Sequence, residues 1–480
     1  MDILLTHGYF IEEDEHEKKI MKPYPPLGML YISAYLKQRG FHVGVFDTTF
    51  SSKEQLYAYI EQNRPPVVGI YTNLMTKLNV LPLIKVCKAA GSYVVLGGPE
   101  PPHYADRFLQ AGADAIVVGE GELTLEELIP ALMQRGPHQL HGVKGVVFRD
   151  EAGSVVTNLS RPQIKPLDDL PFPDRQAIPM HKYLDTWRTY HGASSVSLIT
   201  ARGCPYTCKW CSHSVYGTTH RRRSVENVVA EMERIIEQFN PDQVWYADDV
   251  FTIHRSWTLK YAAALKERGI KVPFECISRA DRLDREVIDA LKEMGCYRLW
   301  IGSESGSQRI LDAMDRKTSV QDVQAKIRML KAAGIQTGMF IMLGYEGEEM
   351  ADLQATVDHL KKSDPDLFLT TVAYPIKGTP YYYEVESRII ESKPWHERTD
   401  RDLTVAGRHS KRFYSFVTRW MVNEVALYKM RMRHDRNPKK LVKAFINARI
   451  GRLGMALTAH QVETAPAGRG QIHVENALTR

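Results

Sequence analysis

The chain has 480 residues, of which 44% are apolar and 25% are charged, the composition of a soluble globular protein of about three domains. These values exclude a disordered, collagen-like or disulfide-rich chain, and no apolar run reaches the ~20 residues of a membrane helix. The net charge of +6 is uneven, because residues 400–480 carry 16 Lys and Arg and only 6 Asp and Glu. This last sixth is either a solvated helical tail or a basic surface for an anionic partner.

The cysteine content and the N-terminus bear on the cellular compartment. The chain begins with a strand-like run and shows no secretory signal. Its six cysteines are too few for a disulfide framework in a chain of this length. We therefore expect reduced thiols and a cytoplasmic protein.

Residues 1–136 alternate short apolar runs with amphipathic helical patterns. The expected strands are Ile3–Leu5, Val43–Phe46, Val67–Tyr71, Val94–Leu96 and Ala115–Val118. This alternation is typical of an α/β fold with a doubly wound, Rossmann-like parallel sheet. Ligands of such sheets bind beyond the carboxyl ends of the strands.

Residues 137–194 break the alternation. They contain a predicted hairpin of residues 145–149 and 155–158, followed by five prolines between Pro162 and Pro179. Proline at this density disfavours regular structure. We interpret the segment as an ordered, proline-rich linker between two domains.

A second alternating series occupies residues 195–380. Its expected strands are Val196–Thr200, Gln243–Ala247, Phe274–Ser278, Arg298–Gly302, Thr337–Leu343 and Leu367–Ala373. Six strand–helix units predict a parallel β/α barrel, complete or partial, with its catalytic residues at the carboxyl ends of the strands. Residues 381–480 are expected to form a basic helical region.

Three of the six cysteines lie close together after the first strand of this second series. Cys204, Cys208 and Cys211 have the spacing C-x3-C-x2-C. Closely spaced thiolates on a loop suit a soft metal or an iron–sulfur cluster. A zinc site needs a fourth ligand, for which His213 is available. A [4Fe–4S] cluster with only three protein ligands leaves one iron open to a small molecule.

The C-x3-C-x2-C motif, with Trp210 before its last cysteine, resembles that of the radical S-adenosylmethionine (SAM) enzymes. In that family the open iron chelates SAM, and one-electron reduction yields a 5′-deoxyadenosyl radical. The resemblance implies that Cys204, Cys208 and Cys211 hold the cluster. Two segments further along the chain, Cys276–Arg279 and Ile301–Gly306, resemble motifs of the cobalamin-dependent branch of this family and follow the cysteine motif in the same order as there. This resemblance implies that Ser278, Arg279 and Glu304 contact SAM. Asp248, in the acidic end of another strand, is either structural or a SAM contact.

Residues 1–136 resemble the cobalamin-binding domain of the same branch. Thr72 and Asn73 follow the third expected strand, and Gly97 and Gly98 follow the fourth. The resemblance implies that these four residues line a corrinoid, where small residues let a flat ligand approach the backbone. The corrinoid motif D-x-H-x-x-G is absent. His7 lacks that pattern, so we expect no protein histidine below cobalt.

The resemblance implies a cobalamin-dependent radical SAM C-methyltransferase that acts on an unactivated carbon. An oxidative cyclase similar to the anaerobic magnesium-protoporphyrin ester cyclase and a non-catalytic corrinoid carrier are the alternatives. The implied partners are a small-molecule, natural-product, lipid or tetrapyrrole substrate and a reductant such as flavodoxin or ferredoxin, and no nucleic acid. No catalytic residue is identified. Residues 438–457 alternate basic and apolar side chains, as a helix packed on the barrel or one resting on a membrane surface would.

Overall fold

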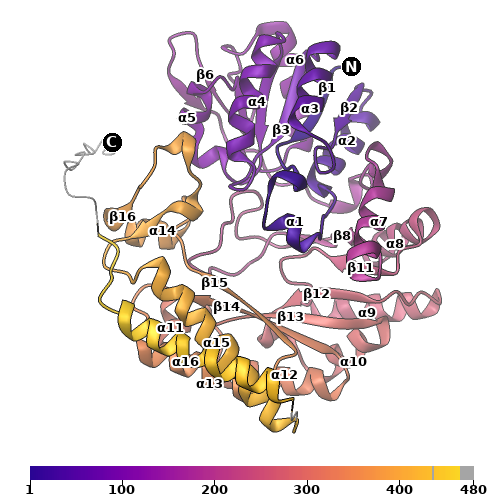
Figure 1. Cartoon of the computed structure of the whole chain (residues 1–480). Helices are drawn as coiled ribbons and strands as arrows, with labels where there is room; N and C mark the ends of the chain where they lie inside the picture. Colours follow the sequence, from indigo (N-terminus) through magenta and orange to yellow (C-terminus); the bar gives the residue numbers. More distant parts are fainter. Residues whose placement is uncertain (435–436, 465–480) are drawn as a thin grey trace.

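The computed structural model describes residues 1–434 and 437–464. Two sheets, each surrounded by helices, follow one another along the chain, and a helical C-terminal part packs against the second (Figure 1). Within the described residues, no helix combines the length and hydrophobicity needed to cross a bilayer.

The first sheet has seven strands in the order β2-β1-β3-β4-β5-β6-β7. The strands are β1 (Ile3–His7), β2 (Val43–Phe46), β3 (Val67–Tyr71), β4 (Tyr93–Gly97), β5 (Ala115–Val117), β6 (Val146–Arg149) and β7 (Val155–Thr157). The first five strands are parallel. The hairpin β6–β7, within the segment interpreted as a linker, adds to this sheet in antiparallel orientation.

Helices cover both faces of the first sheet, as expected of a doubly wound fold. They are α1 (Glu17–Ile20), α2 (Leu27–Gln38), α3 (Lys53–Asn63), α4 (Lys77–Ala89), α5 (Ala105–Gln110) and α6 (Glu122–Arg135). Successive strand residues enter different cores: Leu5 and Val95 belong to one buried cluster, Leu4 and Val94 to the other. This alternation explains why the strands are apolar on both faces.

The second sheet has six parallel strands in the order β15-β14-β13-β12-β11-β8. The strands are β8 (Ser195–Leu198), β11 (Gln243–Tyr246), β12 (Phe274–Ser278), β13 (Cys296–Glu304), β14 (Gln336–Leu343) and β15 (Leu367–Val372). Strands β8 and β15 lie at opposite edges, so the predicted barrel is partial. Each crossover contains a helix, which a parallel sheet requires.

The helices around the second sheet begin where the sequence provides caps. They are α7 (Met180–His191), α8 (Val225–Phe239), α9 (Arg255–Glu267), α10 (Arg285–Met294), α11 (Gln308–Ala313), α12 (Val320–Ala332) and α13 (Met350–Ser363). The Ser224 hydroxyl accepts a hydrogen bond from the Asn227 backbone N–H at 3.1 Å and caps α8. Asp284 caps α10 in the same way.

The C-terminal part is mainly helical and adds to the core of the second sheet. It comprises α14 (Pro380–Val385), β16 (Ile389–Ile390), β17 (Thr404–Val405), α15 (Lys411–Met432) and α16 (Pro438–Thr458). The short antiparallel pair β16–β17 was not expected from the sequence. Trp420 and Val425 of α15 are buried in the same cluster as the barrel strands. Residues 465–480 of the expected basic region lie outside the described residues.

Two groups of buried ion pairs join the first sheet to the second. In one, Arg202 lies 2.6 Å from both Glu120 and Glu122, and Arg221 lies 2.8 Å from Glu120.

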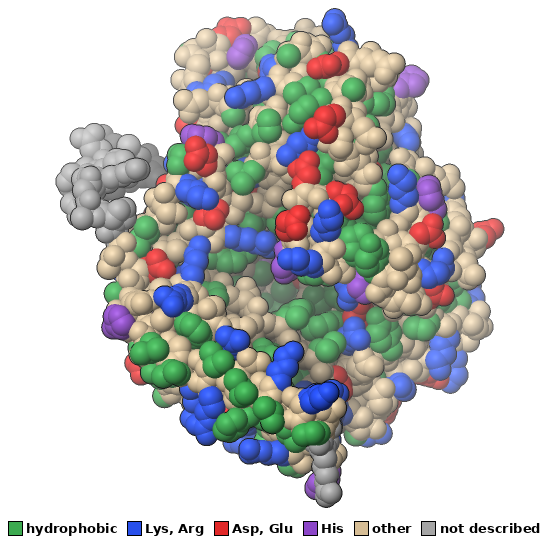
Figure 2. All heavy atoms as spheres, viewed as in Figure 1, with side chains coloured by type: hydrophobic (Ala, Val, Ile, Leu, Met, Phe, Trp, Pro, Cys, Tyr) green, Lys and Arg blue, Asp and Glu red, His purple; other side chains and the backbone are tan. Residues whose placement is uncertain are grey.

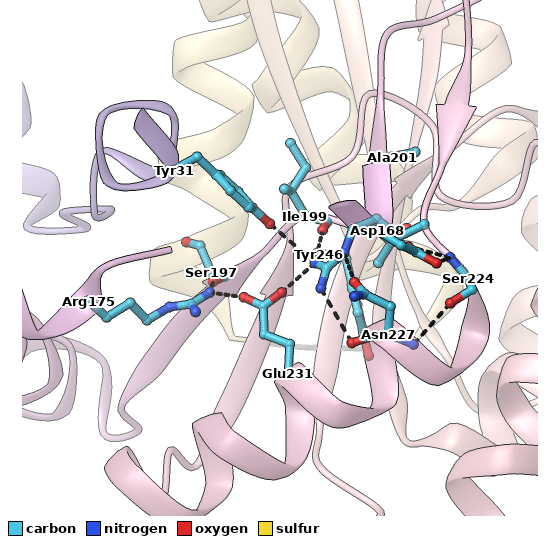
Figure 3. A network of polar contacts seen from close by, with 12 residues as sticks. Tyr31, Asp168, Arg175, Ser197, Ile199, Ala201, Ser224, Asn227, Glu231 and Tyr246 are labelled. Carbon is cyan, nitrogen blue, oxygen red and sulfur yellow. Dashed lines mark hydrogen bonds and ion pairs between the residues drawn. The ribbon is translucent and has the colours of Figure 1, made fainter. Parts of the chain in front are cut away.

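In the other group, Glu231 of α8 has no exposed surface. It lies 2.7 Å from Arg175 of the proline-rich segment and pairs with Arg223, which donates to the Tyr31 hydroxyl of α2 (Figure 3). Buried charges persist when they are paired in this way. These contacts set the placement of the two sheets.

Candidate active site

The three clustered cysteines lie on the loop between two short antiparallel strands, β9 (Ala201–Arg202) and β10 (Arg221–Arg222). Cys204 is half-buried, Cys208 is buried and Cys211 is exposed. The surrounding protein desolvates the Cys211 thiol and raises its pKa to about 12, with Asp249, Cys208 and Cys204 adding to the shift. The three thiols are therefore close enough to affect one another, and their role as cluster ligands stays a prediction.

Two arginines point toward the Cys208 sulfur. Arg279 Nη1 lies 4.0 Å and Arg316 Nη1 lies 3.8 Å from Sγ. Guanidinium groups at this distance stabilise a thiolate, the form of cysteine that binds iron. Burial raises the pKa of the Cys208 thiol, and Arg279 acts against that shift. Three cysteines on one loop, with positive charge beside Cys208, fit an iron–sulfur cluster.

The zinc alternative, with His213 as fourth ligand, lacks a suitable arrangement of side chains. Within the described residues, no three His, Cys, Asp or Glu side chains are grouped to hold one metal ion. In an iron–sulfur cluster each thiolate binds a different iron, so the ligands need not converge on one point.

Glu304, at the carboxyl end of β13, adopts an unusual backbone conformation. Its φ of 63° lies in the left-handed region, which few residues other than glycine occupy. Burial raises its pKa to about 8, and its carboxyl lies 3.8 Å from Arg316. Strained, buried polar residues of this kind cluster at functional sites. Glu304 and Arg279 thus both lie near Cys208.

Ser278, the other SAM contact implied by the resemblance, is buried and already has partners. Its hydroxyl lies 2.5 Å from the Thr252 hydroxyl and 3.2 Å from the Arg279 carbonyl. The structure therefore places Ser278 next to Arg279 but engages its hydroxyl within the protein.

The carboxylate of Asp248 is bound by other groups of the protein. It accepts hydrogen bonds from the Thr200 and Ala201 backbone N–H groups at 2.6 and 3.3 Å and from the Thr200 hydroxyl, and it pairs with Arg222 at 3.2 Å. These contacts use both carboxylate oxygens. Asp248 therefore fixes the chain that leads from β8 into the cysteine loop, which was one of the two roles expected for it.

A cleft of about 420 Å³, here called the glycine cleft, lies at the carboxyl edge of the first sheet. Gly28 and Gly97 line it, and a Cβ atom at either position would have no heavy atom within 4 Å. Gly98 also lines the cleft, but its φ is +108° and a Cβ atom would lie 2.3 Å from the Thr72 carbonyl oxygen. The apolar, backbone-lined walls fit a large flat ligand such as a corrinoid.

Thr72 and Asn73 lie beside the glycine cleft and not in its lining. Thr72 is fully buried, and its N–H donates to the Gly97 carbonyl at 2.7 Å. The Asn73 side chain accepts from the Met75 and Thr76 N–H groups. Both residues therefore shape the turn that supports the two glycines.

The sequence reasoning missed the far wall of the glycine cleft. Arg202, Val215 and Tyr216 come from the cysteine-loop region and complete the lining together with Glu120 and Glu122. The available signals were the position of Arg202 just before Gly203-Cys204 and the two carboxylates in the Gly119–Glu122 turn. A single sequence does not show that these segments meet.

His7 is engaged within the fold. Its Nε2 lies 3.0 Å from Asp47 Oδ1 and its Nδ1 lies 2.9 Å from the Thr48 hydroxyl. The ring is 4% exposed and lies outside the lining of the cleft. His7 is therefore held by Asp47 and Thr48, and a cobalamin without a protein histidine below cobalt stays a prediction.

Comparison with known proteins identifies two domains in the expected order. The B12 binding domain family matches residues 19–129 and the radical SAM superfamily matches residues 198–360. An uncharacterized methyltransferase of Pyrococcus horikoshii is 28% identical, over 80% of this chain and 84% of its own length. The anaerobic magnesium-protoporphyrin IX monomethyl ester cyclase of Rubrivivax gelatinosus is 26% identical, over 79% and 70%.

A solved structure shares the whole arrangement. The radical SAM methyltransferase TsrM of Kitasatospora setae, with cobalamin and a [4Fe–4S] cluster bound, matches with a TM-score of 0.68 at 20% identity, over 80% of this chain and 77% of that one. This likeness establishes the fold. Independently of that likeness, the two matched domains identify a radical SAM enzyme with a B12 binding domain, and its cofactors are SAM, a [4Fe–4S] cluster and cobalamin.

Proposed function

We propose that this enzyme is a C-methyltransferase that acts on an unactivated carbon. The observation that carries the proposal is the shared wall of the two cofactor sites. Arg202, two residues before Cys204, lines the glycine cleft, and so do Val215 and Tyr216, which follow Cys211. A carbon held at this wall would lie between the two proposed cofactor sites, which a transfer between them requires.

The residues divide into two groups in this proposal. Cys204, Cys208 and Cys211 would hold the cluster, and Arg279 and Glu304, which lie near Cys208, would contact the SAM bound to it. Gly97, Gly98 and Gly28 let the corrinoid approach the backbone, and Thr72 and Asn73 support that turn. When bound, the cluster and SAM supply the 5′-deoxyadenosyl radical and the corrinoid supplies the methyl group. The protein orients these groups and excludes water.

The reaction needs one electron for each radical, so we propose a flavodoxin or ferredoxin as reductant and a cytoplasmic location, where thiols stay reduced. The substrate is proposed to be a small molecule. Asp249, next to the cysteine loop, is exposed, which is consistent with entry of a small molecule from solvent.

The similarity to the ester cyclase supports oxidative cyclisation as a second candidate. The two reactions differ in how they consume SAM. With cobalamin-loaded, cluster-reconstituted enzyme, SAM and dithionite but no substrate, we expect one S-adenosylhomocysteine per bound cobalamin in a single burst, measured by liquid chromatography. A cyclase has no use for a methyl donor and should release none. With substrate, 5′-deoxyadenosine and S-adenosylhomocysteine should form in about equal amounts per product.

Gly97 offers a direct test of the corrinoid site. A leucine at position 97 has free space in the cleft and an allowed backbone, so the chain should fold while the side chain fills the cleft. We expect cobalamin affinity to fall about 10–100-fold, the cost of overpacking a ligand site. Cobalamin content after gel filtration, measured by absorbance, checks this, and iron content should stay at the wild-type level.

Gly98→Ala is the matched contrast. Its Cβ atom would strike the Thr72 carbonyl at a positive φ, so it should lower the melting temperature of the cobalamin-free protein. Wild-type cobalamin content in Gly97→Leu would show that the corrinoid lies elsewhere.

A further inference from the structure

Helix α16 has two apolar faces, of which only one is covered. Small residues such as Ala444, Ala448, Gly451 and Gly454 face α15. A Cβ atom at Gly451 would lie 2.6 Å from the Trp420 backbone nitrogen, and one at Gly454 would lie 2.3 Å from the Phe416 ring. Contacts this close fix the rotation of α16 about its axis. The opposite face is therefore held outward.

That outward face carries five large aliphatic side chains, here called the aliphatic stripe. They are 39–63% exposed and follow the spacing of one helix face: Val442, Ile446, Ile450, Leu453 and Leu457. Figure 2 shows hydrophobic side chains gathered over this part of the molecule, with Lys and Arg beside them. A contiguous exposed apolar patch with a polar rim marks a surface that binds a protein or a membrane.

The charged residues of helix α16 itself all have one sign. Helix α16 contains five basic residues and no Asp or Glu: Lys439, Lys440, Lys443, Arg449 and Arg452. A cavity of about 210 Å³ beside the stripe is lined by Lys361, Arg431, Arg449 and Arg452 among others. Its carboxylate, Glu424, pairs with Lys361 at 2.9 Å. Within the described part of the chain, Arg431 and Arg449 pair with no carboxylate.

We propose that the outward face of α16 docks on a lipid bilayer that contains anionic phospholipids. The aliphatic stripe would enter the boundary between headgroups and acyl chains, while the basic residues and the cavity contact lipid phosphates. A helix with this composition lies in the plane of the interface, and each Lys or Arg near an anionic surface adds to the attraction.

Charge distinguishes this occupant from a second copy of the chain. Two copies facing each other through the stripe would bring their basic rims together, which like-charge repulsion opposes. An anionic bilayer meets both the apolar stripe and the positive rim. Figure 2 shows a hollow in the middle of the same face that carries the hydrophobic side chains of the C-terminal helices.

Vesicle flotation of the cofactor-loaded, full-length enzyme tests the proposal. The probes are vesicles of phosphatidylcholine alone and of phosphatidylcholine with phosphatidylglycerol. We expect the enzyme to float with the anionic vesicles, to bind the neutral ones more weakly, and to dissociate as salt is raised. The double variant Ile450→Gln/Leu453→Gln should bind at least about tenfold more weakly, because two aliphatic side chains no longer leave water.

The matched control is Met133→Gln/Leu159→Gln. Met133 and Leu159 are 54% and 78% exposed but lie beside the first sheet, so binding should stay at the wild-type level. SAM cleavage without vesicles should be unchanged in both double variants, which shows that they fold.

Failure of the wild type to float with anionic vesicles, or equal flotation of the stripe variant, overturns the proposal. Light scattering adds the remaining outcome. A wild-type dimer that the stripe variant converts to a monomer, with no vesicle binding, would assign the stripe to a second copy.

Discussion

Replacing Cys208 with alanine is expected to abolish the iron–sulfur cluster. The variant should contain background iron, lack the brown chromophore after anaerobic reconstitution, and release no 5′-deoxyadenosine from SAM. The reason is that a cluster with only three protein ligands is no longer stably bound when one of the three thiolates is removed. Iron and sulfide analysis, absorbance and a deoxyadenosine assay measure the three effects.

Cys87→Ala is the matched control for this prediction. Cys87 lies in α4, is fully buried and has a pKa that burial raises to about 12, as befits an inert core thiol. Its loss should cost about 1 kcal/mol of stability and leave the cluster intact. An intact cluster in Cys208→Ala, or a lost cluster in Cys87→Ala, would contradict the ligand assignment.

Glu231→Gln is expected to lower the free energy of unfolding by about 3–5 kcal/mol, because Arg175 and Arg223 would remain buried without their shared counter-charge. A loss of this size is a large part of the free energy of unfolding of a typical domain. Urea denaturation followed by circular dichroism measures it. Loss of the Tyr31 contact through Arg223 should also loosen the first sheet from the second.

The control for Glu231 lies on the same helix. Glu233 pairs with Arg268 at 2.7 Å, but both side chains are about half exposed, so Glu233→Gln should cost less than about 1 kcal/mol. Equal effects of the two variants would show that the buried cluster is not a principal tie between the sheets.

Most of the parallel strands were predictable because they are buried on both faces, as β1 and β8 are along their whole length. The structure contains strands with the expected bounds at Val43–Phe46, Val67–Tyr71 and Phe274–Ser278. A short, continuous apolar run bounded by turn residues is typical of a strand in a parallel sheet. The cluster motif was visible because its ligands are neighbours in the chain. Strands of two residues, such as β16 and β17, are too short to show an alternation of apolar and polar residues, so the sequence did not predict them.

The site residues were harder to assign because a side chain's role depends on what it meets. Thr72 and Asn73 follow a strand end, as ligand contacts do, yet the fold uses them to close a turn. Asp248 stands in an acidic motif, but Thr200, Ala201 and Arg222 take up its carboxylate. These partners lie 26–48 residues from Asp248 in the sequence. No helical or strand periodicity in the sequence indicates that they meet in the fold.

The open form of the second sheet has a consequence for selectivity. A closed eight-stranded barrel fills its interior with side chains, whereas here β8 and β15 are the two edge strands of an open sheet. An interior that no strand closes can admit a larger substrate than the inside of a closed barrel. We therefore expect this enzyme to accept one reacting group on scaffolds of different size.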